Sequence, residues 1–392
     1  MARADRPVVV LVESNTTGTG EMFVDRLIER GYAVHFFTRA PDKYPFLSAK
    51  PLTLHHVDTG DDARLLRLAC DLGAPVAGVW SASEYAIGAA SRLAQQLGLP
   101  CLAHDAIAAC RDKAYQRLLL NSSGLSPVPY RVVADAKQAL AAADDIGFPL
   151  VVKPVSGSGS VGVRVYRTRA AMRRDVARQL ANIPDGRYLV ESHIAGPQYS
   201  VELFDGEVIG LTRQYYGPPP ACIAVGHDFP AMLDTAATRA LADLARAAAA
   251  LFGLARGPVH IEARLGAEGG GRIIEINPRL AGGYIPELIR LATGIDLIAW
   301  CIDFCTGSAR RPGPPRQHHA AIGFFLRGQH DPARIAAPTP DCAVTLYPPR
   351  ADVDGGSRQG DFRDRFGHVV AVADQAGLAR ERVDRFLHGL SI

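Results

Sequence analysis

The sequence predicts a protein of mixed α/β and α+β class, with a parallel sheet first along the chain and antiparallel strand pairs after it. Two observations support this prediction. Apolar strand-like runs alternate with helix-like segments over the first hundred residues, which favours a parallel sheet covered by helices. Two later glycine-rich turns, at 154–163 and 266–271, each join two strand-like runs. The chain of 392 residues is long enough for two or three domains with their own cores.

The predicted elements follow this order along the chain. In the first part, strands are expected at 8–12, 33–37 and 76–80, and helices at 22–30, 61–70 and 85–97. Next come a helix at 105–123, a strand at 129–133, a helix at 136–145, and strands at 150–153 and 163–166. Strands at 188–191 and 199–203, a proline-rich loop at 216–220, a helix at 235–251, and strands at 259–265 and 272–276 follow. The prolines at 312–315 mark a linker before a mixed final segment.

Composition narrows the class of protein. A net charge of +3 with no run of Lys or Arg argues against nucleic acid or a membrane surface as partner. No apolar segment approaches the ~20 residues of a membrane span, and the first one is too short for the core of a signal peptide. We therefore expect a cytoplasmic protein. Seven cysteines without a paired C-x-x-C are expected to be small buried hydrophobes, with Cys301 and Cys305 in the core.

The loop ESNTTGTG, residues 13–20, follows the first strand and precedes a helix, an arrangement that attracts anions. A dinucleotide fingerprint would need a third glycine and an acidic residue at the end of the next strand. Phe23 occupies the position of that glycine, and the next strand runs into Thr38-Arg39. Dinucleotide binding is therefore disfavoured, and we expect a different anion at this loop.

The stretch KPVSGSGSVGV, residues 153–163, places a lysine at a strand end before a small, flexible loop. Its glycines let the backbone approach phosphates, and its serines offer hydroxyl donors. It is not a P-loop, because no G-x-x-x-x-G-K-[ST] is present. Taken alone, a glycine-rich hairpin without a ligand explains this stretch equally well. Only five of the 43 basic residues are lysines, however, and Lys153 is one of them.

The stretch HIEARLGAEGGGRIIEINPRLAGG, residues 260–283, contains two glutamates on strands that a glycine turn folds side by side. Glu262 and Glu275 lie thirteen positions apart, and Asn277 shares a strand face with Glu275. Carboxylate and amide oxygens suit Mg²⁺. Solvated strand faces are the alternative, but the flanking isoleucines indicate a buried hairpin, where spare carboxylates would be costly. We therefore predict a metal site, with Arg279 beside it.

In this order, these pieces resemble the ATP-grasp superfamily: RDK ending at Lys113, VVKP with its serine-glycine loop, LVESHI, GPQYSVE and EINPR. The resemblance covers residues 1 to about 310, and the last eighty resemble the C-terminal lobe of that family. It implies an ATP-grasp fold with an N-terminal Rossmann-like (pre-ATP-grasp) parallel-sheet domain at 1–104. A small lobe with the phosphate loop is implied at 105–193, a large lobe with the metal and arginine site at 194–310, and a C-terminal lobe at 311–392.

The resemblance also implies the cofactors, ATP and Mg²⁺ with Mn²⁺ as the alternative ion, and the site residues. The implied ATP contacts are Lys113, Lys153, Ser158, Gly159, Ser160, Glu191, Ser192, Ile194 and Gln198. Gln198 stands where the family usually has a ribose-binding glutamate, so its amide oxygen would take that contact. The implied metal ligands are Glu262, Glu275 and Asn277. Expected substrate contacts are Asn15, Thr17, Gly18, Glu84, His227, Arg279, Gly282 and Gly283, and the expected catalytic residues are Arg279 and Lys153.

Two motifs, NPRLAGG and VGHDFPA, resemble the L-amino-acid ligase and carnosine-synthase-like branch. This implies ATP-dependent amide formation through an acyl phosphate, joining amino acids or small carboxylates with release of ADP and phosphate. Small carboxylates and amines would be the partners, and a homodimer is left open. Gly282 and Gly283 are expected to leave room for a bulky amine, and a loop hydrogen bond is the alternative role for His227. The alternative functions are a biotin-carboxylase-like or purine-pathway-like ligase and a non-catalytic nucleotide-binding protein.

Overall fold

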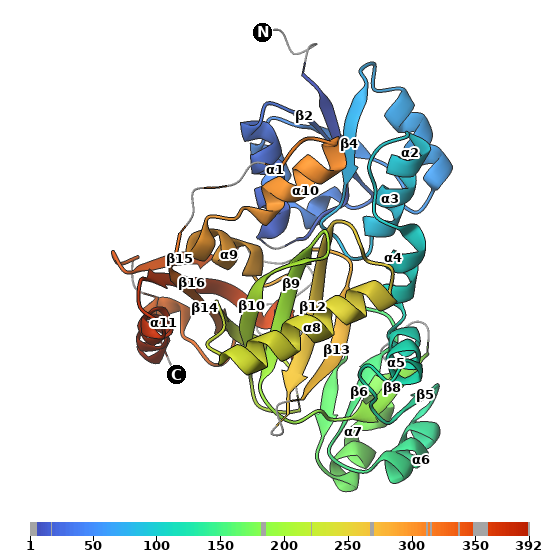
Figure 1. Ribbon diagram of the computed structural model, residues 1–392, viewed down its shortest axis with the longest axis vertical. Coiled ribbons are helices and arrows are strands. Elements are labelled where there is room, and N and C mark those ends of the chain that lie inside the picture. Colours follow the sequence, from blue (N-terminus) through green and yellow to red (C-terminus); the bar gives the residue numbers. More distant parts are fainter. Residues whose placement is uncertain are drawn as a thin grey trace.

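The computed structural model describes residues 6–16, 18–181, 186–220, 222–266, 270–310, 313, 316–335, 338–347 and 360–390. The described strands form three sheets, two of four strands and one of eight. In Figure 1 the N-terminal sheet lies at the top, the second four-stranded sheet at the lower right, and the eight-stranded sheet between them. The linker prolines Pro312, Pro314 and Pro315 lie outside the described residues.

The N-terminal sheet is parallel, with the strand order β3-β2-β1-β4. Its strands are β1 (Val8–Val12), β2 (Ala33–Thr38), β3 (Thr53–His56) and β4 (Val76–Trp80). Its helices are α1 (Thr19–Glu29), α2 (Asp62–Cys70) and α3 (Ile87–Gln96), with short 3₁₀ helices η2 (Pro41–Lys43) and η3 (Pro45–Ala49). Every residue of β1 is buried, as expected for a central strand covered on both faces. The sequence predicted these elements apart from the edge strand β3 and the 3₁₀ helices.

The single helix expected at 105–123 is two helices, α4 (His104–Arg111) and α5 (Lys113–Ser122). Asp112 separates them in an extended conformation, and its side chain accepts a hydrogen bond from the backbone N–H of Tyr115. This is an N-cap, which ends the preceding helix and starts a new one. Lys113 therefore begins α5, and its backbone N–H donates to the carbonyl of Val155 at 2.9 Å.

The second sheet is antiparallel, with the order β5-β8-β6-β7. Its strands are β5 (Tyr130–Val133), β6 (Leu150–Pro154), β7 (Arg164–Tyr166) and β8 (Tyr188–Ser192). Helices α6 (Ala136–Ile146) and α7 (Arg169–Ala181) pack against each other beside it. The sequence did not predict α7, because its buried apolar residues Met172, Val176 and Leu180 stand among arginines and alanines.

The eight-stranded sheet is antiparallel, with the order β13-β12-β9-β10-β11-β14-β16-β15. Its strands are β9 (Gln198–Phe204), β10 (Glu207–Tyr216), β11 (Ala224–Phe229), β12 (Pro258–Leu265), β13 (Gly271–Asn277), β14 (His319–Leu326), β15 (Cys342–Leu346) and β16 (Arg365–Ala373). The sequence did not predict β10 and β11. The loop expected at 216–220 starts at residue 217 in the structure, because Tyr216 still belongs to β10. The strands of the final segment thus continue the sheet that carries the glutamate hairpin, and the predicted lobe boundaries stay a prediction.

The remaining helices cover this sheet and join it to the first one. They are α8 (Thr235–Leu251), α9 (Ile285–Thr293), α10 (Leu297–Thr306) and α11 (Leu378–His388), with 3₁₀ helices η4 (Pro332–Arg334) and η5 (Phe362–Asp364). Helix α10 packs against β4 and α1, whereas α9 packs against β11 and β14. One hydrophobic core therefore extends from β1 and β2 through α9 and α10 to β14, which fixes the N-terminal sheet against the large one.

Cys301 and Cys305 are fully buried in α10, as predicted. The expectation that all seven cysteines are buried is wrong for Cys70, which is exposed, and for Cys101 and Cys222, which are half-buried. Within the described parts of the chain, no helix is long and apolar enough to cross a membrane.

Candidate active site

A cavity of about 1260 Å³ lies where the three sheets meet, and it gathers the residues singled out from the sequence. The site residues that line it are Asn15, Gly18, Glu84, Lys113, Lys153, Ser158, Gly159, Ser160, Glu191, Ser192, Ile194, Gln198, His227, Glu262, Glu275, Asn277, Arg279, Gly282 and Gly283. Thr17 lies outside the described residues. Segments that are far apart in the sequence therefore contribute to one space.

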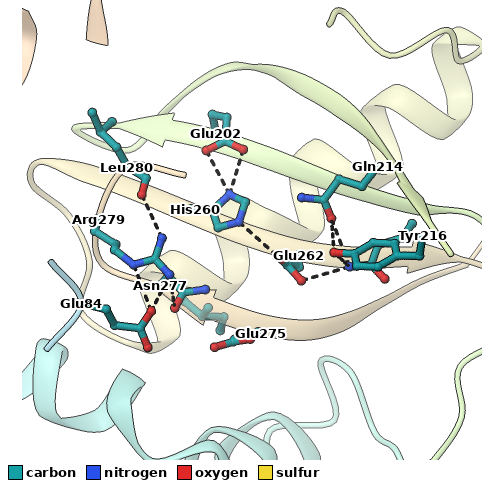
Figure 2. A network of polar contacts seen from close by, with 12 residues as sticks. Glu84, Glu202, Gln214, Tyr216, His260, Glu262, Glu275, Asn277, Arg279 and Leu280 are labelled. Carbon is teal, nitrogen blue, oxygen red and sulfur yellow. Dashed lines mark hydrogen bonds and ion pairs between the residues drawn. The ribbon is translucent and has the colours of Figure 1, made fainter. Parts of the chain in front are cut away.

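The hairpin of β12 and β13 presents the predicted oxygen ligands on its cavity face. Glu262 pairs directly with Glu275, and His260 pairs with Asn277 on the neighbouring strand. The intervening Ile261 and Ile276 are fully buried on the opposite face, because side chains alternate along a strand. Figure 2 shows Glu262, Glu275 and Asn277 on these two adjacent strands.

This donor set fits Mg²⁺. Two carboxylates and one amide oxygen are hard ligands, and Mg²⁺ usually takes few protein ligands and completes its shell with water and phosphate oxygens. Among the described residues, no three His, Cys, Asp or Glu side chains form a cluster suited to a metal ion. The hairpin offers only two carboxylates, Glu262 and Glu275, together with the amide of Asn277. Phosphate oxygens would therefore have to supply further ligands to the ion.

His260 lies between Glu262 and Glu202 of β9 and links the two carboxylates (Figure 2). Its Nδ1 is 2.9 Å from one Glu202 oxygen, and its Nε2 is 3.2 Å from Glu262 Oε1. Burial alone would lower the pKa of His260, but the two carboxylates outweigh it and raise the pKa to about 10. The imidazole is therefore a buried cation that orients Glu262. The contact between His260 and Glu262 was not identified from the sequence, although the H-x-E spacing places both residues on one strand face.

Two lysines carry positive charge into the cavity, and each has a carboxylate partner. Lys113 Nζ is 3.0 Å from Glu275 Oε1 and donates to the carbonyl of Gly157 at 2.5 Å. Lys153 Nζ is 2.6 Å from Glu191 Oε1. Both lysines thus lie beside the glycine loop and the hairpin, where they could bind anionic phosphates.

Glu191 faces a second buried cation. Arg117 on α5 donates from Nε to Glu191 Oε2 at 2.9 Å. Burial would raise the pKa of Glu191, but Lys153 and Arg117 outweigh it and keep the pKa below its ordinary value. Because the carboxylate is occupied by these two cations, adenine contact at this strand end would fall to the backbone near Ser192 and Ile194. That contact stays a prediction.

Gln198 is held by neighbours on the large sheet. Its Nε2 lies 3.0 Å from Glu262 Oε2, 2.9 Å from the Tyr216 hydroxyl and 3.1 Å from Gln214 Oε1. Its Oε1 accepts from Arg264 Nε at 3.2 Å. Only one lone pair of the amide oxygen is then left for a ligand, and the expected ribose contact stays a prediction.

The glycine loop closes against two other parts of the chain. Ser158 Oγ is 3.3 Å from the Tyr85 hydroxyl of the N-terminal domain. The Phe362 ring of η5 lies so close to Gly159 that an added Cβ would come within 2.6 Å of it, and Gly159 has a φ of +67°. Glycine is therefore required at this position both for the backbone conformation and for the close approach.

Arg279 connects the hairpin to the N-terminal domain. Its guanidinium forms an ion pair with Glu84, and its Nε is 3.1 Å from Glu84 Oε2. It also donates to the Leu280 carbonyl at 2.9 Å, as Figure 2 shows. Burial would lower the pKa of Arg279, but Glu84 outweighs it and raises the pKa. The guanidinium is therefore charged and held in the cavity wall.

The opening loop ends in the N-terminus of α1. Gly18 precedes this helix with a φ of +57°, and the Tyr284 ring fills the place of its missing side chain. Asn15 Nδ2 donates to Thr19 Oγ1 at 2.9 Å. The carboxylate of Glu13 is buried and accepts four hydrogen bonds, from the side chains of Thr38, Tyr44 and Thr59 and from the backbone of Arg39. All four donors to this carboxylate therefore come from the N-terminal domain itself.

His227 and the two glycines require a correction. His227 is buried, its Nδ1 has no hydrogen-bond partner in the described residues, and its ring stands edge-on to Phe324 at 5.6 Å. A Cβ on Gly283 would lie 2.6 Å from His227 Nε2, and Gly283 has a φ of +62°. The expectation of free room at Gly283 is wrong, because the imidazole fills it. A Cβ on Gly282 meets nothing within 4 Å, so the open space lies there.

Comparison with known proteins places the chain in a family. Residues 146–287 match the ATP-grasp domain family. The chain is 33% identical over 415 aligned residues to uncharacterized protein y4rH of Sinorhizobium fredii, covering 99% of this chain and 84% of that one. The chain belongs to the ATP-grasp superfamily. This ATP-grasp ligase is also 28% identical to a D-alanine–D-alanine ligase of Stutzerimonas stutzeri, over 53% of this chain and 69% of that protein.

The fold of this ATP-grasp ligase is that of known members. The crystal structure of an L-amino acid ligase from Bacillus licheniformis has a TM-score of 0.79 and 18% identity, with 98% of both chains covered. The ATP-grasp fold predicted from the motifs is thereby confirmed. Members of the family bind ATP with Mg²⁺.

Several cavity residues of this ATP-grasp ligase were not found from the sequence. They are Tyr216, Arg264, Phe324, Tyr347, Phe362 and Arg365. Arg264 lies within the stretch at 260–283 but was not singled out there, whereas the others come from segments with no recognisable motif, and most of the six lie in the C-terminal third of the chain. Only their convergence on the large sheet identifies them, and this convergence depends on strand pairing.

Proposed function

We propose that this ATP-grasp ligase joins a carboxylate to an amine, forming an amide through an acyl phosphate with release of ADP and phosphate. The observation that supports it most is the single cavity in which Lys113, Lys153, the Glu262–Glu275 pair and Arg279 all meet. The opening loop of the N-terminal domain lines the same cavity. One cavity would thus hold the cations for the phosphates, the ligands for the metal ion and the residues that contact a second substrate.

The nucleotide would lie between the small and large lobes. Lys113, Lys153 and the loop at 156–160 would bind its phosphates, and Glu262, Glu275 and Asn277 would hold Mg²⁺. When bound, Mg²⁺ neutralises phosphate charge and orients the oxygens. His260 would keep Glu262 pointed at the ion, because it approaches one oxygen of that carboxylate at 3.2 Å.

The reaction would take place beside Arg279. The γ-phosphoryl group passes to an oxygen of the carboxylate substrate, and ADP leaves. The amine nitrogen then attacks the acyl carbon, the C–O bond to phosphate breaks, and the amine loses a proton. Arg279 would stabilise the negative oxygens of both steps, so that catalysis consists mainly of positioning and charge neutralisation.

A coupled assay of ADP release tests this function. The full-length protein with Mg²⁺ and ATP is given pairs of L-amino acids, and the products are identified by mass spectrometry. We expect release of ADP and phosphate that requires both a carboxylate and an amine, with an amide of the summed mass less water. ADP release that needs bicarbonate and no amine would instead indicate the biotin-carboxylase-like or purine-pathway-like alternative.

Gly282→Trp should narrow the range of accepted amines to small ones. A side chain at Gly282 enters open space in the cavity wall three residues after Arg279. Filling that space should lower kcat/KM for bulky amines by about tenfold to a hundredfold, with KM for ATP unchanged. Gly389→Trp, on an exposed position after α11, is the matched control. If Gly282→Trp accepts bulky amines as the wild type does, the amine pocket lies elsewhere.

A further inference from the structure

Arg365, the first residue of β16, lines the cavity without an acidic partner. Its Nε donates to the carbonyl of Ala224 at 3.1 Å, and its guanidinium carbon lies 3.9 Å from the centre of the Phe324 ring. Neither contact supplies a negative charge. Both Nη nitrogens lack a protein acceptor among the described residues, and no carboxylate there forms an ion pair with this side chain.

The other buried or half-buried lysine and arginine side chains of the cavity are satisfied by the protein. Three form ion pairs, which are Lys113–Glu275, Lys153–Glu191 and Arg279–Glu84. Arg264 has no such pair, but it contacts Gln198 Oε1, His193 Nε2 and the carbonyl of Ile194. Arg365 differs from all four in having donors to spare.

A guanidinium in this position calls for a counter-charge. Taking a charged group out of water is costly unless an opposite charge or acceptors replace the water. Burial accordingly lowers the pKa of Arg365, although an arginine stays charged throughout. The Asp361 carboxylate, four positions earlier, is bound by Arg363 at 2.6 Å. An anionic ligand would therefore complete the site.

The place of Arg365 points to a substrate anion. Its platform, Phe324, also carries the His227 ring, and His227 Nε2 fills the space beside Gly283. Gly283 follows Arg279 by four residues, so one continuous wall leads from Arg365 to the site of acyl transfer. Lys113 and Lys153, on α5 and β6, line the same cavity, but each already pairs with a carboxylate.

Aromatic side chains complete the surroundings of Arg365. The Tyr284 and Tyr347 rings are stacked with centroids 6.2 Å apart, and both line the cavity with Phe324. The Tyr347 hydroxyl is 2.9 Å from His368 Nδ1. Such walls accept an apolar side chain, and the guanidinium offers a carboxylate a charged partner beside them.

We propose that Arg365 binds the carboxylate of the amine substrate, so that this ligase takes an amino acid as its nucleophile and not a plain amine. The inference rests on the proposed ligase function. The carboxylate of the acyl donor is the group that is phosphorylated, and it must lie beside Arg279 and the metal ligands. A second anion site on the same wall is then available for a carboxylate that does not react.

The test compares amino acids with their decarboxylated analogues as nucleophiles, L-phenylalanine with phenethylamine and L-leucine with 3-methylbutylamine. The wild type should prefer the amino acids. Arg365→Leu should lower kcat/KM for the amino acids about tenfold to a hundredfold, the effect of losing a charge-assisted hydrogen-bonded pair. It should leave the amines and KM for ATP unchanged. Arg365→Lys keeps the charge without the planar fork and should lie between.

Arg385→Leu is the control for loss of one positive charge, because Arg385 is exposed on α11 and pairs only with Glu381 among the described residues. Equal loss for amino acids and amines, or a raised KM for ATP, would overturn the proposal and assign Arg365 to structure or to phosphate. So would a wild type that uses amines as well as amino acids, although the ligase function would then stand.

A binding measurement separates this proposal from the proposed function. Calorimetry with L-phenylalanine in the presence of Mg²⁺ and a non-hydrolysable ATP analogue needs no turnover. We expect binding to the wild type that Arg365→Leu loses, with binding of the ATP analogue retained by both as proof of folding. If wild type and variant bind L-phenylalanine equally, or if neither binds it, the assignment of Arg365 is wrong.

Discussion

Glu275→Gln is expected to lose nearly all Mg²⁺-dependent turnover while the protein keeps its fold. The neutral amide of glutamine cannot balance the positive charge of Mg²⁺ as the carboxylate does. It also loses the ion pair with Lys113, which is 3.0 Å long in the wild type. Removing one fixed electrostatic contact of this kind lowers kcat by about 100- to 1,000-fold. ADP release measured against Mg²⁺ concentration gives the rate, and far-ultraviolet circular dichroism reports the fold.

The matched control for this prediction is Glu287→Gln on α9. Glu287 is a half-buried carboxylate that pairs with Arg290 at 2.6 Å and does not line the cavity. Its substitution should leave the Mg²⁺ dependence unchanged. Wild-type rates in Glu275→Gln would contradict the assignment of this residue as a metal ligand, and equal losses in both variants would indicate a general effect on folding.

Arg117→Met should destabilise the protein by about 3–5 kcal/mol, the usual cost of breaking a buried charge pair. Arg117 is 2% exposed and joins three segments. It donates to Glu191 at 2.9 Å, to the Ile273 carbonyl at 3.0 Å and to the Ser126 carbonyl at 3.3 Å. Methionine fills much of the space but leaves the buried Glu191 with one cation in place of two. Urea unfolding followed by circular dichroism measures the change.

Arg178→Met is the control for Arg117→Met, since Arg178 is 79% exposed and its pair with Asp175 lies on the surface. Its effect should stay within about 0.5 kcal/mol. If Arg117→Met is equally mild, the buried pair of Arg117 and Glu191 does not stabilise the fold. A second check is Glu191→Gln combined with Arg117→Met, which should cost less than the sum of the single changes, because the two side chains share one interaction.

Elements with strong local patterns were predicted well. The strands at 8–12 and 76–80 and the helix at 235–251 have the predicted bounds, because their apolar periodicity and flanking turns are unambiguous. The strand β3, with sequence TLHH, is a mostly exposed edge without that pattern. Strands β10 and β11 depend on partners on both sides, so their stability comes from the sheet and not from their own residues.

The sequence indicated many of the residues that line the cavity but not how they pair with one another. Motif spacing indicates that Glu262 and Glu275 meet, because a short turn joins their strands. Nothing local indicates that Arg279 meets Glu84, which is 195 positions away, or that His260 meets Glu202, 58 positions away. The same lack of a local signal explains the error at Gly283, since the imidazole that fills its space belongs to His227 on the distant strand β11.

The eight-stranded sheet has a consequence for engineering. Because β14 pairs with β11 and is followed by β16 and β15, a fragment cut before β14 would leave β11 as an open edge, with unpaired backbone donors and acceptors that invite association with other chains. Chimeras between family members face the same constraint. To transfer a substrate preference, an exchange has to move β11 and β14–β16 as one block, and a crossover between α10 and β14 would divide a single cavity wall between two parents.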